Sequence, residues 1–173
     1  DVEVDRAGWS GFLDLLKKYR RRRPLNGVIV AISLAELLQQ TEAERATHAH
    51  TVQQRIQELY KRLGTTLTVY VLFTKSDLVA GFTEFFDDLG TDERAQVWGM
   101  TFPTNAAAKP QNEVEHFGAE YDALLGRLNA RLLTRMQQER DIQRRGLIWR
   151  FPRQMAELKP IAEDFVQTVF RPS

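Results

Sequence analysis

The residues whose types best suit ligand binding are Thr74, Lys75 and Asp77, in the segment VYVLFTKSDLVAGF. They follow an apolar run rich in β-branched and aromatic side chains, which predicts a strand buried within a sheet. In open parallel sheets, ligands bind at the carboxyl ends of the strands. The carboxylate of Asp77 can accept hydrogen bonds from two donors, as recognition of a nucleotide base requires. The three residues are therefore a candidate nucleotide-base turn.

A turn of the form [N/T]-K-x-D occupies this position in GTPase-like folds. Its aspartate accepts hydrogen bonds from the guanine ring nitrogens, and the stem of its lysine lies along the base plane. The same residues also fit a simpler structure, in which Asp77 caps the next helix and Lys75 faces water. The four-residue pattern leaves both interpretations open.

The residues that would hold nucleotide phosphates are missing from the sequence. It contains no G-x-x-x-x-G-K-[ST] loop, whose backbone amides cradle phosphates. The segment DRAG, from Asp5 to Gly8, matches a D-x-x-G turn, but such a turn must follow a buried strand. The preceding DVEV is too short and too acidic, so we expect DRAG to lead into the first helix. We therefore predict that this chain is not an enzyme and performs no phosphoryl transfer.

No other catalytic or metal-binding set is predicted. Asp87 and Asp88 follow two phenylalanines in a helical stretch, which favours an exposed helix face over an acid–base pair. The sequence has no cysteine, and His48 and His50 are two residues apart in a predicted helix, so they point to different faces. We expect these histidines and His116 on the solvated surface, and no metal or cofactor in this chain.

The composition is that of one globular domain. The 173 residues are 43% hydrophobic and 27% charged with a formal net charge of +1, so bulk charge predicts neither nucleic-acid nor membrane binding. No apolar run approaches the roughly 20 residues needed to cross a bilayer, and the acidic opening DVEVDRAGW is unlike a signal peptide. Because the chain starts without methionine and stops after a predicted helix, we expect a soluble piece of a longer protein.

The first part of the chain alternates strand and helix signals. The predicted strands lie near 26–32, 67–73 and 98–102. Ser33 and Thr41 each precede a glutamate three residues later, a capping box that begins a helix. Alternating strands and helices predict a parallel sheet with right-handed crossovers, whose long apolar strands need helices on both faces.

A first amphipathic helix, from Trp9 to Tyr19, ends in the cationic stretch KKYRRRRP. Positive charge in a last helical turn complements the helix dipole, which favours a solvated helix end. The same stretch could contact a partner, such as a nucleic acid or lipid headgroups. The sequence lacks the aromatic interleaving or groove-reading motif of nucleic-acid binders, so we expect no nucleic-acid partner.

The last part of the chain is predicted to be helical. One long amphipathic helix starts near Glu113, and Gly146 is expected to end it. A further helix follows, kinked at Pro160. The predicted organisation is an α/β part over 1–110 and a helical extension over 111–173 packed on it, joined through TNAAAKPQN. The fold class predicted from these patterns is α/β, a parallel sheet with flanking helices, followed by an α-helical extension.

Three segments resemble the IcmF/TssM family of the bacterial type VI secretion system: RRRRPLNGVIVAISLAELL, YVLFTKSDLVAGFTEFFDDL and FPRQMAELKPIAEDFVQTVFRPS. Together with the residues between them, the resemblance covers nearly the whole chain. Members are large inner-membrane proteins with a cytoplasmic GTPase-like domain. The resemblance implies that the sheet is a partial GTPase-like parallel sheet. The chain would be the C-terminal half of that domain plus its helical extension, because the family's phosphate loop and D-T-A-G turn precede this segment.

The resemblance also implies a site and a function. Thr74, Lys75 and Asp77 match the family's base-recognition turn, although ordinary GTPases have asparagine where Thr74 stands. A structural and interaction module is expected, linking the inner-membrane complex to cytoplasmic baseplate proteins. The alternative is part of a functional NTPase, in which GTP or ATP bound by the full-length protein drives conformational change in secretion.

Overall fold

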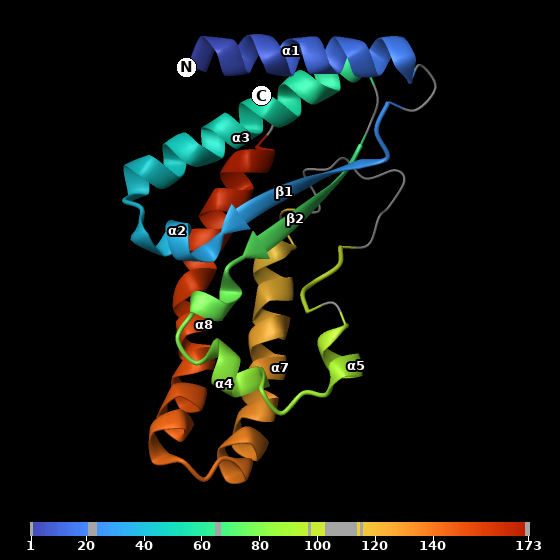
Figure 1. The fold of residues 1–173 in the computed structure, drawn as a ribbon. Coiled ribbons are helices and arrows are strands. Elements are labelled where there is room, and N and C mark those ends of the chain that lie inside the picture. Colours follow the sequence, from blue (N-terminus) through green and yellow to red (C-terminus); the bar gives the residue numbers. More distant parts are fainter. Residues whose placement is uncertain are drawn as a thin grey trace.

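The computed structural model describes residues 2–20, 24–64, 67–96, 98–102, 114 and 116–171. In chain order the elements are α1 (Val2–Tyr19), β1 (Gly27–Ser33), α2 (Leu34–Gln39), α3 (Glu42–Leu63), β2 (Thr68–Thr74), the 3₁₀ turn η1 (Ser76–Leu78), α4 (Phe82–Phe86), α5 (Thr91–Arg94), α7 (Phe117–Gln138) and α8 (Ile142–Phe170). Figure 1 shows α7 and α8 as a long hairpin beside the sheet, with α1 lying across α3 at one end of the molecule. The structure is mixed α/β, with helices predominating.

The two described strands form a parallel pair, as the sequence predicts. The register runs from Gly27 opposite Thr68 to Ser33 opposite Thr74, within one residue of the predicted strand bounds. The chain between the strands passes through α2 and α3. Thr41 and Glu44 form the predicted capping box at the start of α3, so this helix begins where the sequence indicates.

One face of the sheet is left open, contrary to the expectation that helices cover both. The strands alternate as their two-residue period requires: Val71 and Phe73 pack against the core, whereas their neighbours on the opposite face do not. Ile29 is 68% exposed, Tyr70 61% and Leu72 52%. Among the described residues the sheet has only β1 and β2, so the outer edge of each strand is also unpaired.

The predicted third strand, 98–102, does not form. Trp98 instead packs its ring against Phe82 and Phe86, with ring centroids 5.8 and 5.3 Å apart. The carbonyl oxygen of Gly99 accepts a hydrogen bond from Arg127 at 3.3 Å rather than from a neighbouring strand. Side-chain packing of this apolar run on the helices therefore takes the place of strand pairing.

The break between the last two helices lies earlier than Gly146, which is inside α8. The helix α7 ends at Gln138. The carboxylate of Asp141 caps the next helix by accepting a hydrogen bond from the Arg144 amide at 2.8 Å. The start of α8 is therefore set by the capping residue Asp141. Gly146 does not end a helix, because a single glycine is tolerated inside one at a modest cost. Pro160 lies within α8 as well.

The larger of two hydrophobic clusters joins residues from both parts of the chain. It contains Ile32 and Val79 from the α/β part together with Tyr121, Phe151 and Phe165 from the final hairpin. The segment TNAAAKPQN and the boundary near 110 lie outside the described residues, so the division into 1–110 and 111–173 stays a prediction. No helix in the described ranges is both long and apolar enough to cross a membrane.

Candidate functional site

The candidate base turn lies at the carboxyl edge of β2, as predicted. Thr74 is the last residue of the strand, and its hydroxyl donates to the carbonyl oxygen of Ile32 at 3.3 Å. Lys75 has a left-handed backbone with φ 57°, which a side chain other than glycine adopts at a cost of about 1 kcal/mol or more. The Leu78 amide donates to the Lys75 carbonyl oxygen at 3.2 Å, which helps to hold this conformation.

Lys75 does not face water alone. Its ammonium lies 2.9 Å from Oε1 of Glu36, and both side chains are about half exposed. The hydrogen bond from Lys75 and its positive charge lower the pKa of the Glu36 carboxyl group. Glu36 was predicted only as half of a capping box with Ser33. The Ser33 hydroxyl does accept from the Glu36 amide at 3.2 Å, but the carboxylate turns to Lys75 instead.

Asp77 is exposed and makes no hydrogen bond or ion pair with the described residues. The 3₁₀ turn and α4 both begin without a side-chain cap, so the interpretation of Asp77 as a helix cap is wrong. Its carboxylate stands free at the carboxyl edge of the sheet. That position is compatible with base recognition, which stays a prediction.

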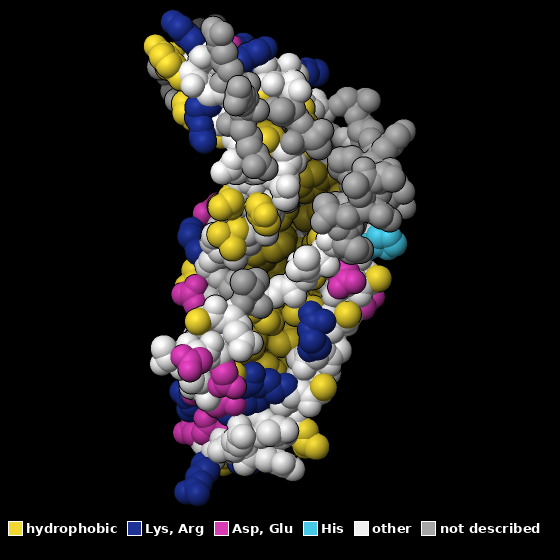
Figure 2. All heavy atoms as spheres, turned by 90° about the vertical axis from the view of Figure 1, so that its right-hand side faces the viewer, with side chains coloured by type: hydrophobic (Ala, Val, Ile, Leu, Met, Phe, Trp, Pro, Cys, Tyr) yellow, Lys and Arg dark blue, Asp and Glu magenta, His cyan; other side chains and the backbone are white. Residues whose placement is uncertain are grey.

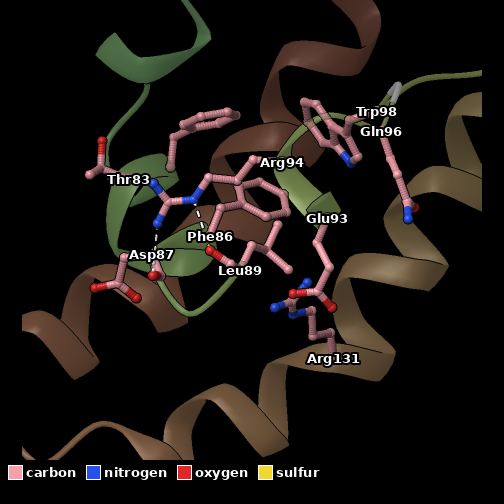
Figure 3. Close-up of a pocket in the computed structure, with 10 residues that line it drawn as sticks. Thr83, Phe86, Asp87, Leu89, Glu93, Arg94, Gln96, Trp98 and Arg131 are labelled. Carbon is pink, nitrogen blue, oxygen red and sulfur yellow. Dashed lines mark hydrogen bonds between the residues drawn. The ribbon is translucent and has the colours of Figure 1, made fainter. Parts of the chain in front are cut away.

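A cleft of about 570 Å³ lies apart from this turn, between α4, α5 and α7. Figure 3 shows Phe86, Leu89 and Trp98 on its apolar side. Two arginines border it. Arg94 donates to the carbonyl oxygens of Leu89 and Asp87, each at 2.9 Å. The second arginine, Arg131, is paired with Asp88. Because both arginines already have acceptors, this cleft offers apolar surface rather than a site for phosphate.

Asp87 and Asp88 belong to an ion cluster and do not simply face solvent. Arg131 donates to both oxygens of Asp88, at 2.6 and 2.7 Å. Asp87 pairs with Arg135 at 2.6 Å and with Arg144. Figure 2 shows acidic and basic side chains gathered toward the end of the molecule that holds the α7–α8 connection, below a hollow lined by hydrophobic side chains. The two carboxylates therefore act as anchors for the arginines of the hairpin.

Arg135 is the most buried member of this cluster, with 4% of its side chain exposed. It donates to the carbonyl oxygens of Phe85 and Glu84 at 3.0 and 2.7 Å. These carbonyls belong to the last turn of α4, whose acceptors have no partner within the helix. Arg135 thus caps α4 from α7, a long-range contact that no local sequence signal indicates.

The histidines differ from the expectation in one case. His48 is partly buried and its ring meets that of Phe165 edge-on, with centroids 5.2 Å apart. Its Nδ1 is buried without a hydrogen-bond partner. His50 and His116 are exposed, as predicted. His48 is less exposed than expected because the turn of α3 that carries it packs against α8, whereas the turn before it is exposed to solvent.

Comparison with known proteins shows which family the chain belongs to. Residues 2–173 match the family model described as the IcmF-related N-terminal domain. The chain belongs to the IcmF-related family. It is 50% identical over 172 residues to the type VI secretion system component TssM1 of Pseudomonas aeruginosa, a match that covers 99% of this chain and 16% of that protein. No solved structure matches the chain.

The match confirms the resemblance to the IcmF/TssM family and corrects its placement. The matched residues are described as an N-terminal domain, whereas we expected the C-terminal half of a domain. The chain spans 16% of the length of TssM1, so it corresponds to a small part of a much longer protein. The match does not show a GTPase-like fold, and it names none of the residues of the base turn.

Proposed function

We propose that this chain is an interaction module of a type VI secretion system. In this role it links the inner-membrane complex to cytoplasmic baseplate components, as a cytoplasmic domain of a bacterial inner-membrane protein. The proposal rests on membership of the IcmF-related family and on 50% identity to TssM1, a type VI secretion component. It assigns the chain no enzymatic step of its own.

The observation that carries the proposal is the open apolar face of the sheet. Ile29, Tyr70 and Leu72 lie side by side there, each more than half exposed. Covering a large apolar side chain contributes about 1.5–3 kcal/mol, and parallel sheets are normally covered on both faces. A face of this kind is suited to packing against further polypeptide, so in the full-length protein this sheet would join the segment to the rest of the scaffold.

We propose further that residues of the longer polypeptide complete this sheet as a GTPase-like one. The two strands are parallel and have unpaired outer edges within the described residues, and the chain covers only 16% of TssM1. Additional strands would satisfy the free backbone groups, and their crossover helices would cover Ile29, Tyr70 and Leu72.

Hydrogen exchange tests this completion. The amides of β1 and β2 should exchange much more slowly in the full-length protein than in the 173-residue chain, because new neighbours cover them. The variant carrying Tyr70→Ser and Leu72→Ser should lose that extra protection. A matched variant, Leu133→Ser, changes an equally exposed residue of α7 and should keep it. Equal exchange in both proteins would contradict the proposal.

The alternative function, part of an NTPase, is favoured by one specific observation. Asp77 stands free at the carboxyl edge of a parallel sheet, one residue beyond Ser76 and two beyond Lys75, as a base turn requires. In this alternative GTP or ATP binds the full-length protein and drives a conformational change. The chain itself supplies no phosphate loop, and phosphate contacts are a major part of nucleotide binding in such folds.

Nucleotide measurements separate the two functions. We expect weak binding at most when GTP or ATP is titrated into the 173-residue chain by calorimetry, and no hydrolysis above a buffer control. If the module is a scaffold, Asp77→Ala in the full-length protein should leave secretion by the bacterium unchanged. The baseplate components should also still co-purify with the variant protein. Deleting the whole segment should abolish that co-purification. Loss of secretion in Asp77→Ala, with micromolar nucleotide binding that the substitution removes, would favour the NTPase.

A further inference from the structure

The helix α1 lies at one end of the molecule, across α3 (Figure 1). One of its faces is fixed there. Leu13 is fully buried in a small cluster with Leu59, Leu63 and Leu67. Arg62 of α3 also pairs with Asp14 of α1 at 3.1 Å. These contacts place α1 firmly on α3 and leave the rest of its circumference uncovered.

The uncovered part of α1 carries an apolar stripe. Phe12 is 49% exposed, Leu15 55% and Tyr19 74%. Their spacing of three and four residues puts them on one face of the helix. Exposed apolar side chains that stand singly are normal, but three in one row at the end of a molecule indicate a contact surface.

Positive charge is concentrated at the C-terminal end of α1, next to Tyr19. Lys17, Lys18 and Arg20 are exposed and form no ion pair with any described residue. The ammonium of Lys18 lies over the Tyr19 ring, 5.5 Å from its centroid. The chain as a whole has a formal net charge of only +1, so this concentration is local.

We propose that α1 binds an anionic lipid surface. Phe12, Leu15 and Tyr19 enter the boundary between headgroups and acyl chains, and Lys18 and Arg20 at the same end of the helix contact the lipid phosphates. A helix with an apolar stripe and a basic end has the composition of helices that lie in the plane of a membrane surface. Each lysine or arginine near an anionic surface strengthens such binding about fivefold.

The apolar stripe decides between a membrane and a nucleic acid. A nucleic acid would neutralise the cations through its phosphates, but a duplex offers no apolar layer that would cover Phe12 and Leu15. An anionic bilayer provides for both features of α1 at once. The helix lies on such a surface and does not cross it, since none of the described helices is apolar enough to span a membrane.

Vesicle flotation tests the proposal with the 173-residue chain. We expect the chain to float with vesicles of phosphatidylcholine and phosphatidylglycerol, and not with phosphatidylcholine alone. High salt should weaken the binding, because it screens the cations. The double variant Phe12→Ser, Leu15→Ser should bind at least about tenfold more weakly, and Lys18→Glu about fivefold or more.

Two control variants keep the test specific. Leu133→Ser removes an even more exposed apolar side chain from α7, and Arg150→Glu reverses an exposed charge on α8. Neither variant should change flotation. Circular dichroism reports whether the double variant keeps its helix content, and Lys18→Glu remains decisive if it does not. Absence of flotation with anionic vesicles would overturn the proposal. So would tighter binding to duplex DNA that the Phe12, Leu15 double variant leaves unchanged.

Discussion

The region around α4 and the two-stranded sheet both contain large apolar side chains, but the two regions differ in how completely these side chains are buried. At α4, Phe85 and Phe151 are fully buried, with ring centroids 5.1 Å apart. Gly81, with φ 86°, lets α4 begin so close to α8 that a Cβ there would clash with the carbonyl oxygen of Leu147. In the sheet, by contrast, Tyr70 and Leu72 remain exposed on the face opposite the core.

The difference shows which part of the molecule is complete. On the inner side of α4, the rings of Phe85 and Phe151 are in contact and fully buried, and Arg135 caps the end of the helix, so this side is complete. The outer side of α4 still borders the open cleft beside Phe86 and Trp98. In the sheet, one face packs against the core, but the outer edge of neither strand is paired within the described residues. We therefore expect the free energy of unfolding to depend mainly on the first region, and binding to depend on the second.

The largest expected effect is that of Phe151→Ala. Phe151 is fully buried among Phe82, Phe85 and Phe86, so the truncation should lower the free energy of unfolding by about 3–5 kcal/mol. Tyr70→Ala, in the open sheet face, should change it by no more than about 0.5 kcal/mol. Urea unfolding followed by circular dichroism measures both. Similar losses for the two variants would erase the contrast between the regions.

A smaller loss is expected for Arg135→Met. Without the guanidinium, the carbonyl oxygens of Phe85 and Glu84 lose their donor at a buried site, which should cost about 2–4 kcal/mol. Arg94 provides a matched control, because it also donates to two backbone carbonyls near α4 but is exposed. Arg94→Met should cost at most about 1 kcal/mol. Equal urea midpoints for the two variants would show that burial of Arg135 adds nothing.

The smallest effect concerns Tyr121, whose hydroxyl donates to the Met155 carbonyl oxygen at 2.9 Å. Burial raises the pKa of Tyr121 to about 12 from its ordinary value of 10. The unfolded chain therefore loses this proton first, so the stabilisation is complete below pH 10 and is lost as the pH rises toward 12. Tyr121→Phe should cost about 1 kcal/mol at neutral pH.

The same variant tests the pH dependence directly. Between pH 10 and pH 12, Tyr121→Phe should lose less of its free energy of unfolding than the unchanged chain does, since it has no hydroxyl to ionise at this site. Urea midpoints measured across that interval give the comparison, with Tyr70→Phe in the open sheet face as a control. Parallel curves for the unchanged chain and Tyr121→Phe would show that burial does not govern this tyrosine.

Much of the fold could be predicted because its signals are local. The apolar runs of β1 and β2 and the capping box of Thr41 and Glu44 depend on residues near one another in sequence. The position of Lys75 and Asp77 at the carboxyl edge of β2 followed from the same strand signal. The expected strand at 98–102 failed because an apolar run has no intrinsic preference between pairing as a strand and packing its side chains on helices.

The sequence by itself determined the parallel pairing of β1 and β2, the helical character of the last part of the chain and the family resemblance. Only the tertiary structure decided that Glu36 pairs with Lys75, that Arg135 caps α4, and that Ile29, Tyr70 and Leu72 stay exposed. The physical reason is distance along the chain. Strand periods and caps act over a few residues, whereas an ion pair between residues 36 and 75 or an uncovered face exists only once distant segments have packed.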